Sequence, residues 1–229
     1  MKKLEEIEIE LNSLHNRARE LLRQWELEAN QPYISWAQQL RADNIKECNL
    51  FISREELLSA LPENSIGAEV GVAQGEFSLR IMEIVHPRML HLIDSEQISN
   101  MRIRPYIDSQ NIKIHRGDSG TVLSKFENNY FDWVYIDADH TLEGVKRDIV
   151  AAKDKLVDGG LLIFNDYTCW SPLEYLRYGV MQAVNEFIID EGWRVVHFAL
   201  HPLGYHDIAI RKPDKASVAG NLGVPKSGS

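Results

Sequence analysis

The sequence predicts a doubly wound α/β fold, in which a mostly parallel, seven-stranded sheet carries helices on both faces. From residue 66 onward, short apolar runs typical of buried strands alternate with stretches of helical periodicity. Acidic residues follow several of these runs, at the sheet edge where open α/β sheets bind ligands. The last two strands are joined through Pro202-Leu-Gly204, which predicts an antiparallel C-terminal hairpin at the edge of the sheet.

Length and composition agree with this class. The chain has 229 residues, of which 44% are apolar and 26% charged, as expected for one soluble domain with an appendage. The net charge of -9 argues against nucleic-acid binding, which depends on clustered basic residues. Because no apolar run approaches the ~18 residues of a membrane span and the N-terminus is acidic, we expect a cytoplasmic protein. The two cysteines, Cys48 and Cys169, fit a reducing compartment.

The N-terminal segment, residues 1–30, is predicted to form one helix that ends before Pro32. Its apolar residues recur at alternating intervals of three and four, which makes one continuous stripe. The stripe must cover either the body of the same chain or a second copy, and the second alternative implies a homo-oligomer. The stripe consists of Leu4, Ile7, Leu11, Leu14, Ala18, Leu21 and Trp25.

The elements of the main domain follow in order. Ser53-Arg-Glu-Glu56 is a capping box that opens a helix from Glu55 to Leu61. Phe131–Ile136 alternates aromatic and β-branched residues, and Leu161–Phe164 is wholly apolar, as in a strand buried on both faces. Gly159-Gly160 is expected to end the preceding helix. The predicted strands are Ile66–Val72, Met89–Ile93, Ile112–His115, Phe131–Ile136, Leu161–Phe164, Trp193–Leu200 and Tyr205–Arg211; the predicted helices are Glu76–Val85, Thr121–Phe126, Thr141–Val157 and Leu173–Glu191.

This pattern divides the chain into three parts. Residues 1–52 form an N-terminal helical extension, residues 53–212 form the main domain, and residues 213–229, rich in Lys, Ser, Gly and Pro, form a flexible tail.

A glycine-rich turn follows the first strand of the main domain. Gly71 and Gly75 allow a close approach to a ligand, and Glu69 stands two residues before the first of them. The spacing is not the dinucleotide fingerprint GxGxxG, and a carboxylate here would repel a pyrophosphate and attract an ammonium group. The alternative interpretation is a tight βα turn with a surface glutamate.

The next two strand ends also carry acidic residues. Asp94 lies 19 residues after Gly75, where an acidic residue can accept hydrogen bonds from ribose hydroxyls. Asp118 and the backbone of Ser119 can bond an adenine amino group, and Asp118 is equally suited to cap a helix. Together these residues predict a site for a nucleoside without a phosphate on the turn.

A metal site is predicted at the fourth and fifth strand ends. Asp137 follows one strand, and Asn165 and Asp166 follow its neighbour. Two carboxylates and an amide oxygen are hard ligands that suit Mg²⁺ or a similar divalent cation.

These motifs resemble those of class I S-adenosylmethionine-dependent methyltransferases, and most closely the bacterial branch with the macrocin-type sugar O-methyltransferases, relatives of the catechol and caffeoyl-coenzyme A O-methyltransferases. The resemblance spans about residues 66–211 and includes EVGVAQGEFS, HLID, RGDS, YIDADH and GGLLIFNDYT. It implies a Rossmann-like fold and metal-assisted methyl transfer to a hydroxyl, of a sugar by first preference or of a catechol-like diol. The order Asn165-Asp166 departs from the Asp-Asn or Asp-Asp of the relatives, so the metal site stays open. The implied S-adenosylmethionine-binding residues are Glu69, Gly71, Val72, Gly75, Asp94, Asp118, Ser119 and Asp137.

Methyl transfer also requires a base and an acceptor pocket. Asp137 and His140 are the two candidates for the group that takes the hydroxyl proton. Two other function classes remain: an NAD(P)-dependent oxidoreductase, for which GxGxxG and a Tyr-Lys pair are missing, and a non-catalytic scaffold. The residues expected near the acceptor are Tyr167, Trp170, His201 and His206, with core or lid packing favoured for Trp170.

Overall fold

The computed structural model describes residues 2–34, 36–98 and 103–213. The chain divides into two compact units, Met1–Trp36 and Ala37–Ser229. The flexible tail expected at 213–229 lies outside the described residues, apart from Pro213. The first unit holds α1 (Lys2–Ala29), so the predicted N-terminal helix is confirmed. Within the described ranges, no helix combines the length and apolar character that crossing a membrane requires.

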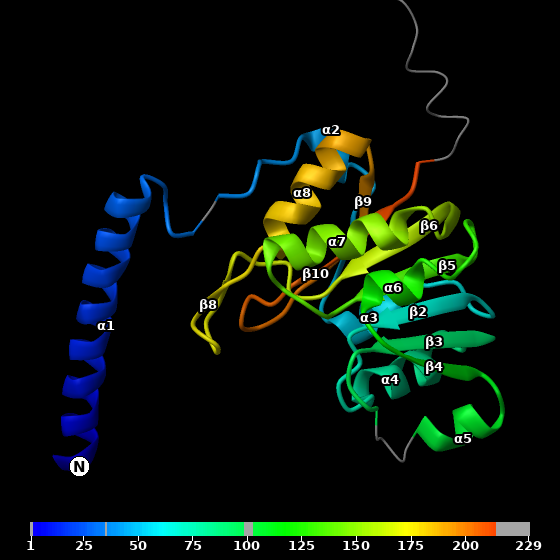
Figure 1. Cartoon of the computed structure of the whole chain (residues 1–229), viewed down its shortest axis with the longest axis horizontal. Coiled ribbons are helices and arrows are strands. Elements are labelled where there is room, and N and C mark those ends of the chain that lie inside the picture. The colour runs from blue at the N-terminus through cyan, green and yellow to red at the C-terminus, as the bar shows by residue number, and fades with distance from the viewer. Residues whose placement is uncertain (1, 35, 99–102, 214–229) are drawn as a thin grey trace, which may run out of the picture. The chain divides into compact units, whose positions relative to one another are not determined.

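The second unit contains all the strands and the other helices (Figure 1). Its strands are β1 (Asn49–Phe51), β2 (Ile66–Val70), β3 (Met89–Asp94), β4 (Ile112–Arg116), β5 (Phe131–Ile136), β6 (Leu156–Phe164), β7 (Trp170–Ser171), β8 (Leu176–Arg177), β9 (Arg194–Ala199) and β10 (Asp207–Arg211). Its helices are α2 (Ala42–Ile45), α3 (Arg54–Leu58), α4 (Glu76–Val85), α5 (Arg104–Asp108), α6 (Ser119–Leu123), α7 (Leu142–Lys153) and α8 (Val180–Glu191).

The main sheet has eight strands in the order β1-β9-β10-β6-β5-β2-β3-β4. Only β10 runs against the others in this sheet, because it pairs antiparallel with both β6 and β9. The predicted doubly wound, mostly parallel sheet and its antiparallel C-terminal hairpin are therefore confirmed. The eighth strand, β1, pairs parallel with β9 outside the hairpin, so the hairpin lies one strand inside the edge.

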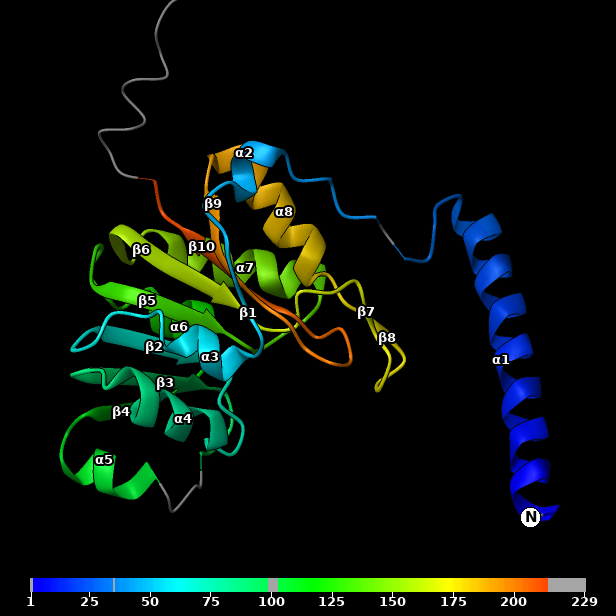
Figure 2. The same ribbon diagram turned by 180° about the vertical axis from the view of Figure 1, so that it is seen from behind.

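Helices cover both faces of this sheet (Figures 1 and 2). The core on one face includes residues of α6, α7 and α8, and the core on the other face includes residues of α3 and α4. Strand β5 supplies both cores: Val134 and Ile136 face one, whereas Trp133 and Tyr135 face the other. This alternation explains why the strand is apolar throughout.

The strand order reverses between β2 and β5. The chain proceeds outward from β2 through β3 to β4, and then crosses back to β5 and β6 on the other side. A crevice outside the carboxyl ends of the strands forms at such a point, and it is where open α/β sheets bind ligands.

The predicted end of the helix Thr141–Val157 is wrong. Gly159-Gly160 was expected to end the helix Thr141–Val157, but α7 ends at Lys153 and both glycines lie inside β6. The register between β5 and β6 shifts between Phe131 and Trp133, and Gly159, with φ of 75°, lies in the strand opposite this irregularity. The two glycines therefore belong to the strand, at the point where its pairing with β5 changes register, and they do not end a helix.

The predicted helix Leu173–Glu191 is also wrong in its first part. Helix α8 begins only at Val180, and the preceding segment forms the small antiparallel pair β7–β8. This segment is held from another part of the chain, because Tyr205 Oη lies 2.6 Å from Ser171 Oγ and accepts a hydrogen bond from Leu173 N at 3.1 Å. Helical periodicity does not report such a distant contact.

The turn after β2 packs directly against the end of β5. Asp137 N donates to Val70 O at 2.7 Å, and Gly71 adopts φ of +83° beside the Asp137 carbonyl. A Cβ atom at Gly71 would lie 1.8 Å from the Asp137 carbonyl oxygen. Only glycine fits this position.

We expect Gly71→Ala to lower the free energy of unfolding by at least about 2 kcal/mol, because it combines positive-φ strain with a backbone clash. Urea denaturation measures the change. Gly192→Ala is the matched control, since Gly192 also has positive φ but a Cβ there would meet nothing within 4 Å. Equal losses in the two variants would show that the approach to Asp137 is not the constraint.

Candidate functional site

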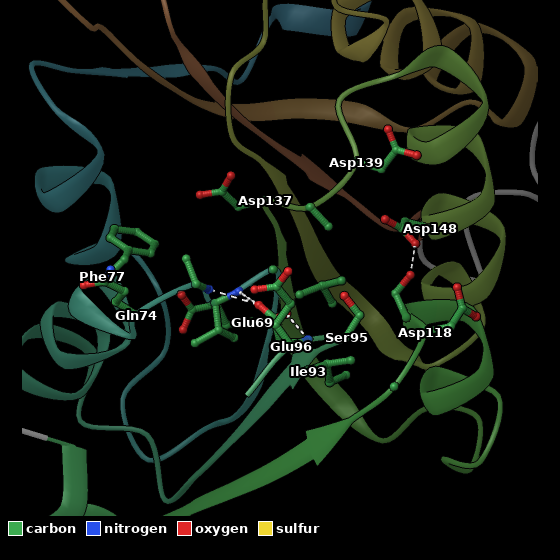
Figure 3. Close-up of a pocket in the computed structure, with 18 of the residues that line it drawn as sticks. Glu69, Gln74, Phe77, Ile93, Ser95, Glu96, Asp118, Asp137, Asp139 and Asp148 are labelled. Atoms are coloured by element: carbon green, nitrogen blue, oxygen red, sulfur yellow. Dashed lines mark hydrogen bonds between the residues drawn. The ribbon is translucent and has the colours of Figure 1, made fainter. Parts of the chain in front are cut away.

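A cavity of about 850 Å³ opens at the carboxyl ends of β2, β3, β4 and β5 (Figure 3). It is of the size that ordinarily holds a small ligand. The structure brings most of the expected nucleoside-binding residues to its wall: Glu69, Gly71, Val72, Asp94, Asp118, Ser119 and Asp137. Gly75 is not among the lining residues; it precedes α4 as its N-cap, with φ of 76°.

The carboxylate of Asp94 holds the glycine-rich turn. Its Oδ2 accepts hydrogen bonds from Val72 N at 2.7 Å and Ala73 N at 3.0 Å, and its Oδ1 accepts from Glu96 N at 2.8 Å. Burial opposes ionisation, but these backbone donors outweigh it and keep the pKa of Asp94 below its ordinary value. Each carboxylate oxygen has two lone pairs, so the two bonds to Oδ2 use both of its lone pairs, and a ligand would bind Asp94 through Oδ1.

Glu69 lies at the floor of the cavity. It is only 1% exposed, so it is not the surface glutamate of the alternative interpretation. Ser78 Oγ donates to Glu69 Oε2 at 2.5 Å, but burial dominates and raises the pKa of Glu69 to about 8. A positive charge in the cavity would favour the ionised form of this carboxyl group.

Asp118 and Ser119 begin α6. Asp118 Oδ1 accepts from Thr121 N at 2.9 Å, which confirms its role as helix cap and lowers its pKa. Ser119 Oγ donates to Asp148 on α7. The acidic side chains that surround the cavity outnumber the two arginines that line it. The site therefore favours a cation. These acidic side chains are Glu69, Glu76, Asp94, Glu96, Asp118, Asp137, Asp139 and Asp148, several of which are labelled in Figure 3.

A second cavity of about 660 Å³ lies beside β6 and β10. Asn165, Asp166 and His201 line it, as do Tyr178 and Tyr205, which the sequence did not indicate. Arg54 lines both cavities.

Three of the four residues expected at the acceptor are not among those that line this second cavity. Tyr167 is buried, and its hydroxyl donates to Asn185 Oδ1 at 2.5 Å. His206 Nδ1 accepts from the backbone N of His201 at 3.1 Å. Trp170 lies in the small strand β7 and is partly buried. The sequence of these short loops does not reveal which of their side chains point into the cavity.

His140 lines neither cavity but contacts residues of both, Asp137 of the first and Asp166 and Tyr178 of the second. Its ring stacks on Tyr178, with ring centroids 4.5 Å apart and planes 2° from parallel. Its Nε2 is buried and lies 3.5 Å from Asp137 Oδ1 and 3.6 Å from Asp166 Oδ2. Burial opposes the charged imidazole, but the neighbouring carboxylates outweigh it and raise the pKa of His140. Burial raises the pKa of Asp166 to about 6.

The predicted magnesium ligands do not fit a divalent cation in this arrangement. The His140 nitrogen lies close to both Asp137 and Asp166, where a shared cation would bind. The amide of Asn165 is held by Asp207, since its Nδ2 donates to Asp207 Oδ1 at 3.0 Å. Over the ranges that the structure describes, no group of three or more His, Cys, Asp or Glu side chains is arranged to hold a metal ion. The metal site is therefore not supported.

Arg54 is the functional candidate that sequence reasoning missed. It begins α3, its guanidinium lies 4.2 Å from the centre of the Phe77 ring, and its Nη1 is 3.9 Å from Asp137 Oδ2. The capping box at Ser53 marked the start of this helix but not the direction of its side chain. Arg54 supplies positive charge between the two cavities.

Residues 68–167 match a family model described as a methyltransferase domain. No curated protein matches the chain at a significant level.

Similar solved structures share the fold. A 1,6-didemethyltoxoflavin-N1-methyltransferase from Burkholderia thailandensis, bound to S-adenosylhomocysteine, is 12% identical, with a TM-score of 0.51 over 70% of this chain and 78% of its own. A S-adenosylmethionine-dependent methyltransferase from Methanosarcina mazei is 12% identical, with a TM-score of 0.52 over 68% of this chain and 95% of its own. The [4+2]-cyclase SpnF is 16% identical, with a TM-score of 0.53 over 70% and 80%.

The family match covers less than half of the chain, and these neighbours show that the chain shares their fold. The cyclase among them shows that the fold alone does not specify the reaction.

The buried carboxyl group of Glu69 makes stability depend on pH. The folded chain keeps a proton that the unfolded chain releases between pH about 4.5 and about 8, so the free energy of unfolding falls as pH rises through this window. We expect Glu69→Gln to reduce this slope by the contribution of Glu69, which amounts to at most about 1.4 kcal/mol per pH unit.

Urea denaturation from pH 5 to pH 8 tests this. Glu76→Gln, which removes an exposed carboxylate of the same cavity, should keep the wild-type slope. If the free energy of unfolding depended on pH equally in the wild type and in Glu69→Gln, the raised pKa of Glu69 would be disproved.

Proposed function

We propose that this chain transfers a methyl group from S-adenosylmethionine to a hydroxyl group of a small molecule or glycan. The match of residues 68–167 to a methyltransferase domain supports the methyl donor. The observation that carries the proposal is the acidic cavity at the strand ends, with a buried carboxyl group, Glu69, at its floor. This site suits a cationic nucleoside.

The cavity has a partner for each part of this cofactor. Glu69 lies on the turn side, where it would receive the amine of the methionine moiety. Asp94 and Glu96 would accept hydrogen bonds from the ribose, and Asp118 with the Ser119 backbone would bind the adenine. When bound, S-adenosylmethionine supplies an electrophilic methyl group, and the residues of the chain orient it toward the second cavity.

His140 is the base in this proposal. Neutral His140 accepts the proton of the acceptor hydroxyl at Nε2, and the carboxylates of Asp137 and Asp166 then stabilise the imidazolium. The stacking on Tyr178 fixes the plane of the ring. Asp137, the other candidate, also lies beside Arg54, so its negative charge is already partly compensated.

A sugar is the preferred acceptor. The second cavity presents the rings of Tyr178 and Tyr205 together with carboxylates and amides, such as Glu174 and Asn165. Such a mixture suits a ring that carries several hydroxyls, because aromatic faces cover its C–H bonds and polar groups accept from its hydroxyls. A catechol-like diol is the second choice.

Calorimetric titration distinguishes the proposal from an oxidoreductase and from a scaffold. We expect binding of S-adenosylmethionine and S-adenosylhomocysteine and no binding of NAD, because Glu69 lies beside the glycine-rich turn and the turn lacks the GxGxxG spacing that binds a pyrophosphate. Asp94→Ala should weaken cofactor binding at least about tenfold, since it removes both the ribose acceptor and the bonds that hold the turn. Asp190→Ala, on the exposed end of α8, is the control. Binding of NAD alone, or of none of the three, would refute the proposal.

The pH dependence of methyl transfer tests the base. Because His140 must be neutral and its pKa is raised, kcat/KM should rise with pH through a pKa above 6.5. His140→Gln should lower kcat by about 10² to 10⁴-fold and flatten this rise. An unchanged pH profile in that variant would assign the proton transfer to another group.

The methyl-transfer assay also tests whether the reaction needs a divalent cation. We propose transfer without a divalent cation, so activity should survive treatment with EDTA. Loss of activity that Mg²⁺ restores would reinstate the metal site predicted from Asp137, Asn165 and Asp166.

A further inference from the structure

The N-terminal helix α1 carries an apolar stripe that the other described residues of its own unit leave uncovered. Its five large aliphatic side chains are 44 to 71% exposed: Leu4, Ile7, Leu11, Leu14 and Leu21. A helix of 28 residues in water is stabilised mainly by packing of its apolar face. We propose that this stripe pairs with the same stripe of a second copy of the chain, in an antiparallel two-stranded coiled coil.

The spacing supports a coiled coil. The stripe residues follow one another at intervals of three and four from Leu4 to Trp25, which is the heptad repeat of two helices that wind around each other. Ile9 and Leu27 are as exposed as the stripe but lie off it. The repeat is therefore a property of one face and not of general apolarity.

The distribution of charge supports a second copy and sets its direction. The first half of α1 is acidic, because it carries four glutamates, at positions 5, 6, 8 and 10, against two lysines. The second half carries three arginines, at positions 17, 19 and 23, and three glutamates, at positions 20, 26 and 28, so its charges balance. A parallel pair would place the acidic halves side by side. An antiparallel pair avoids this repulsion, because it places each acidic half against the half of the other helix that carries the arginines.

The positions that flank the stripe agree with this direction. If Leu11 of one copy packs against Leu14 of the other, Glu10 lies opposite Arg17 and Glu8 lies opposite His15 of the second copy. Two-fold symmetry makes each of these contacts twice. Arg17 already meets Glu20 of its own helix at 3.4 Å, but this pair is exposed and contributes little, so it does not compete.

The register also accounts for the end of the stripe. In this arrangement the facing layers run from Leu4 to Leu21, and Trp25 lies beyond them. Trp25 instead packs edge-on against Tyr33, with ring centroids 5.1 Å apart, after the chain leaves the helix. Ala18, the one small residue of the stripe, falls opposite Ile7, so a small side chain faces a large one.

Sedimentation equilibrium of the full chain tests the pairing. We expect a dimer whose dissociation constant rises at least about tenfold in Leu14→Asp, because a carboxylate replaces a core side chain. Ile9→Asp, an equally drastic change at an exposed position off the stripe, should leave the dimer intact. A monomeric wild-type chain, a higher oligomer, or equal losses in the two variants would overturn the proposal.

Charge exchange tests the direction. Glu10→Arg and Arg17→Glu should each weaken the dimer, and the double variant should restore it, because position 10 faces position 17 only in the antiparallel pair. Failure of the double variant to restore the dimer would overturn this arrangement. Circular dichroism shows that each variant keeps its helices, and S-adenosylmethionine binding, measured separately, does not bear on the outcome.

Discussion

The approach of the β2 turn to the end of β5 is the constraint on which the site depends. Gly71 leaves room for the Asp137 carbonyl, and the Asp94 carboxylate binds the backbone of the same turn. These contacts join three strand ends into one wall. The cavity is therefore largely formed before any ligand binds, which reduces the entropy lost on binding.

Burial raises the pKa values of acidic groups around this wall. Glu69 is held in a position where its charge is unfavourable until a cation arrives, and Asp166 beside His140 is similarly raised in pKa. Such groups destabilise the empty protein, as functional sites often do. The positive Arg54 between the cavities offsets part of this cost.

Sequence patterns were reliable where a residue's role depends on its neighbours in the chain. The capping residue Ser53 accepts from Glu56 N, and helix α4 spans the predicted residues Glu76–Val85. The patterns failed where a distant segment intervenes, as at Gly159-Gly160, whose place is decided by pairing with β5. Tyr167 was expected at the acceptor cavity, yet its hydroxyl donates to Asn185 on α8.

The sequence by itself determined the sheet, its flanking helices and the acidic strand ends, because apolar periodicity and turn residues act locally and strand ends of a parallel sheet share one edge. Only the tertiary structure decided how those side chains are used. It brought His140 to Asp137 and Asp166 in place of a cation, turned Asn165 toward Asp207, and introduced Arg54 from a segment far away in the chain. These outcomes depend on packing between distant segments, which no local pattern encodes.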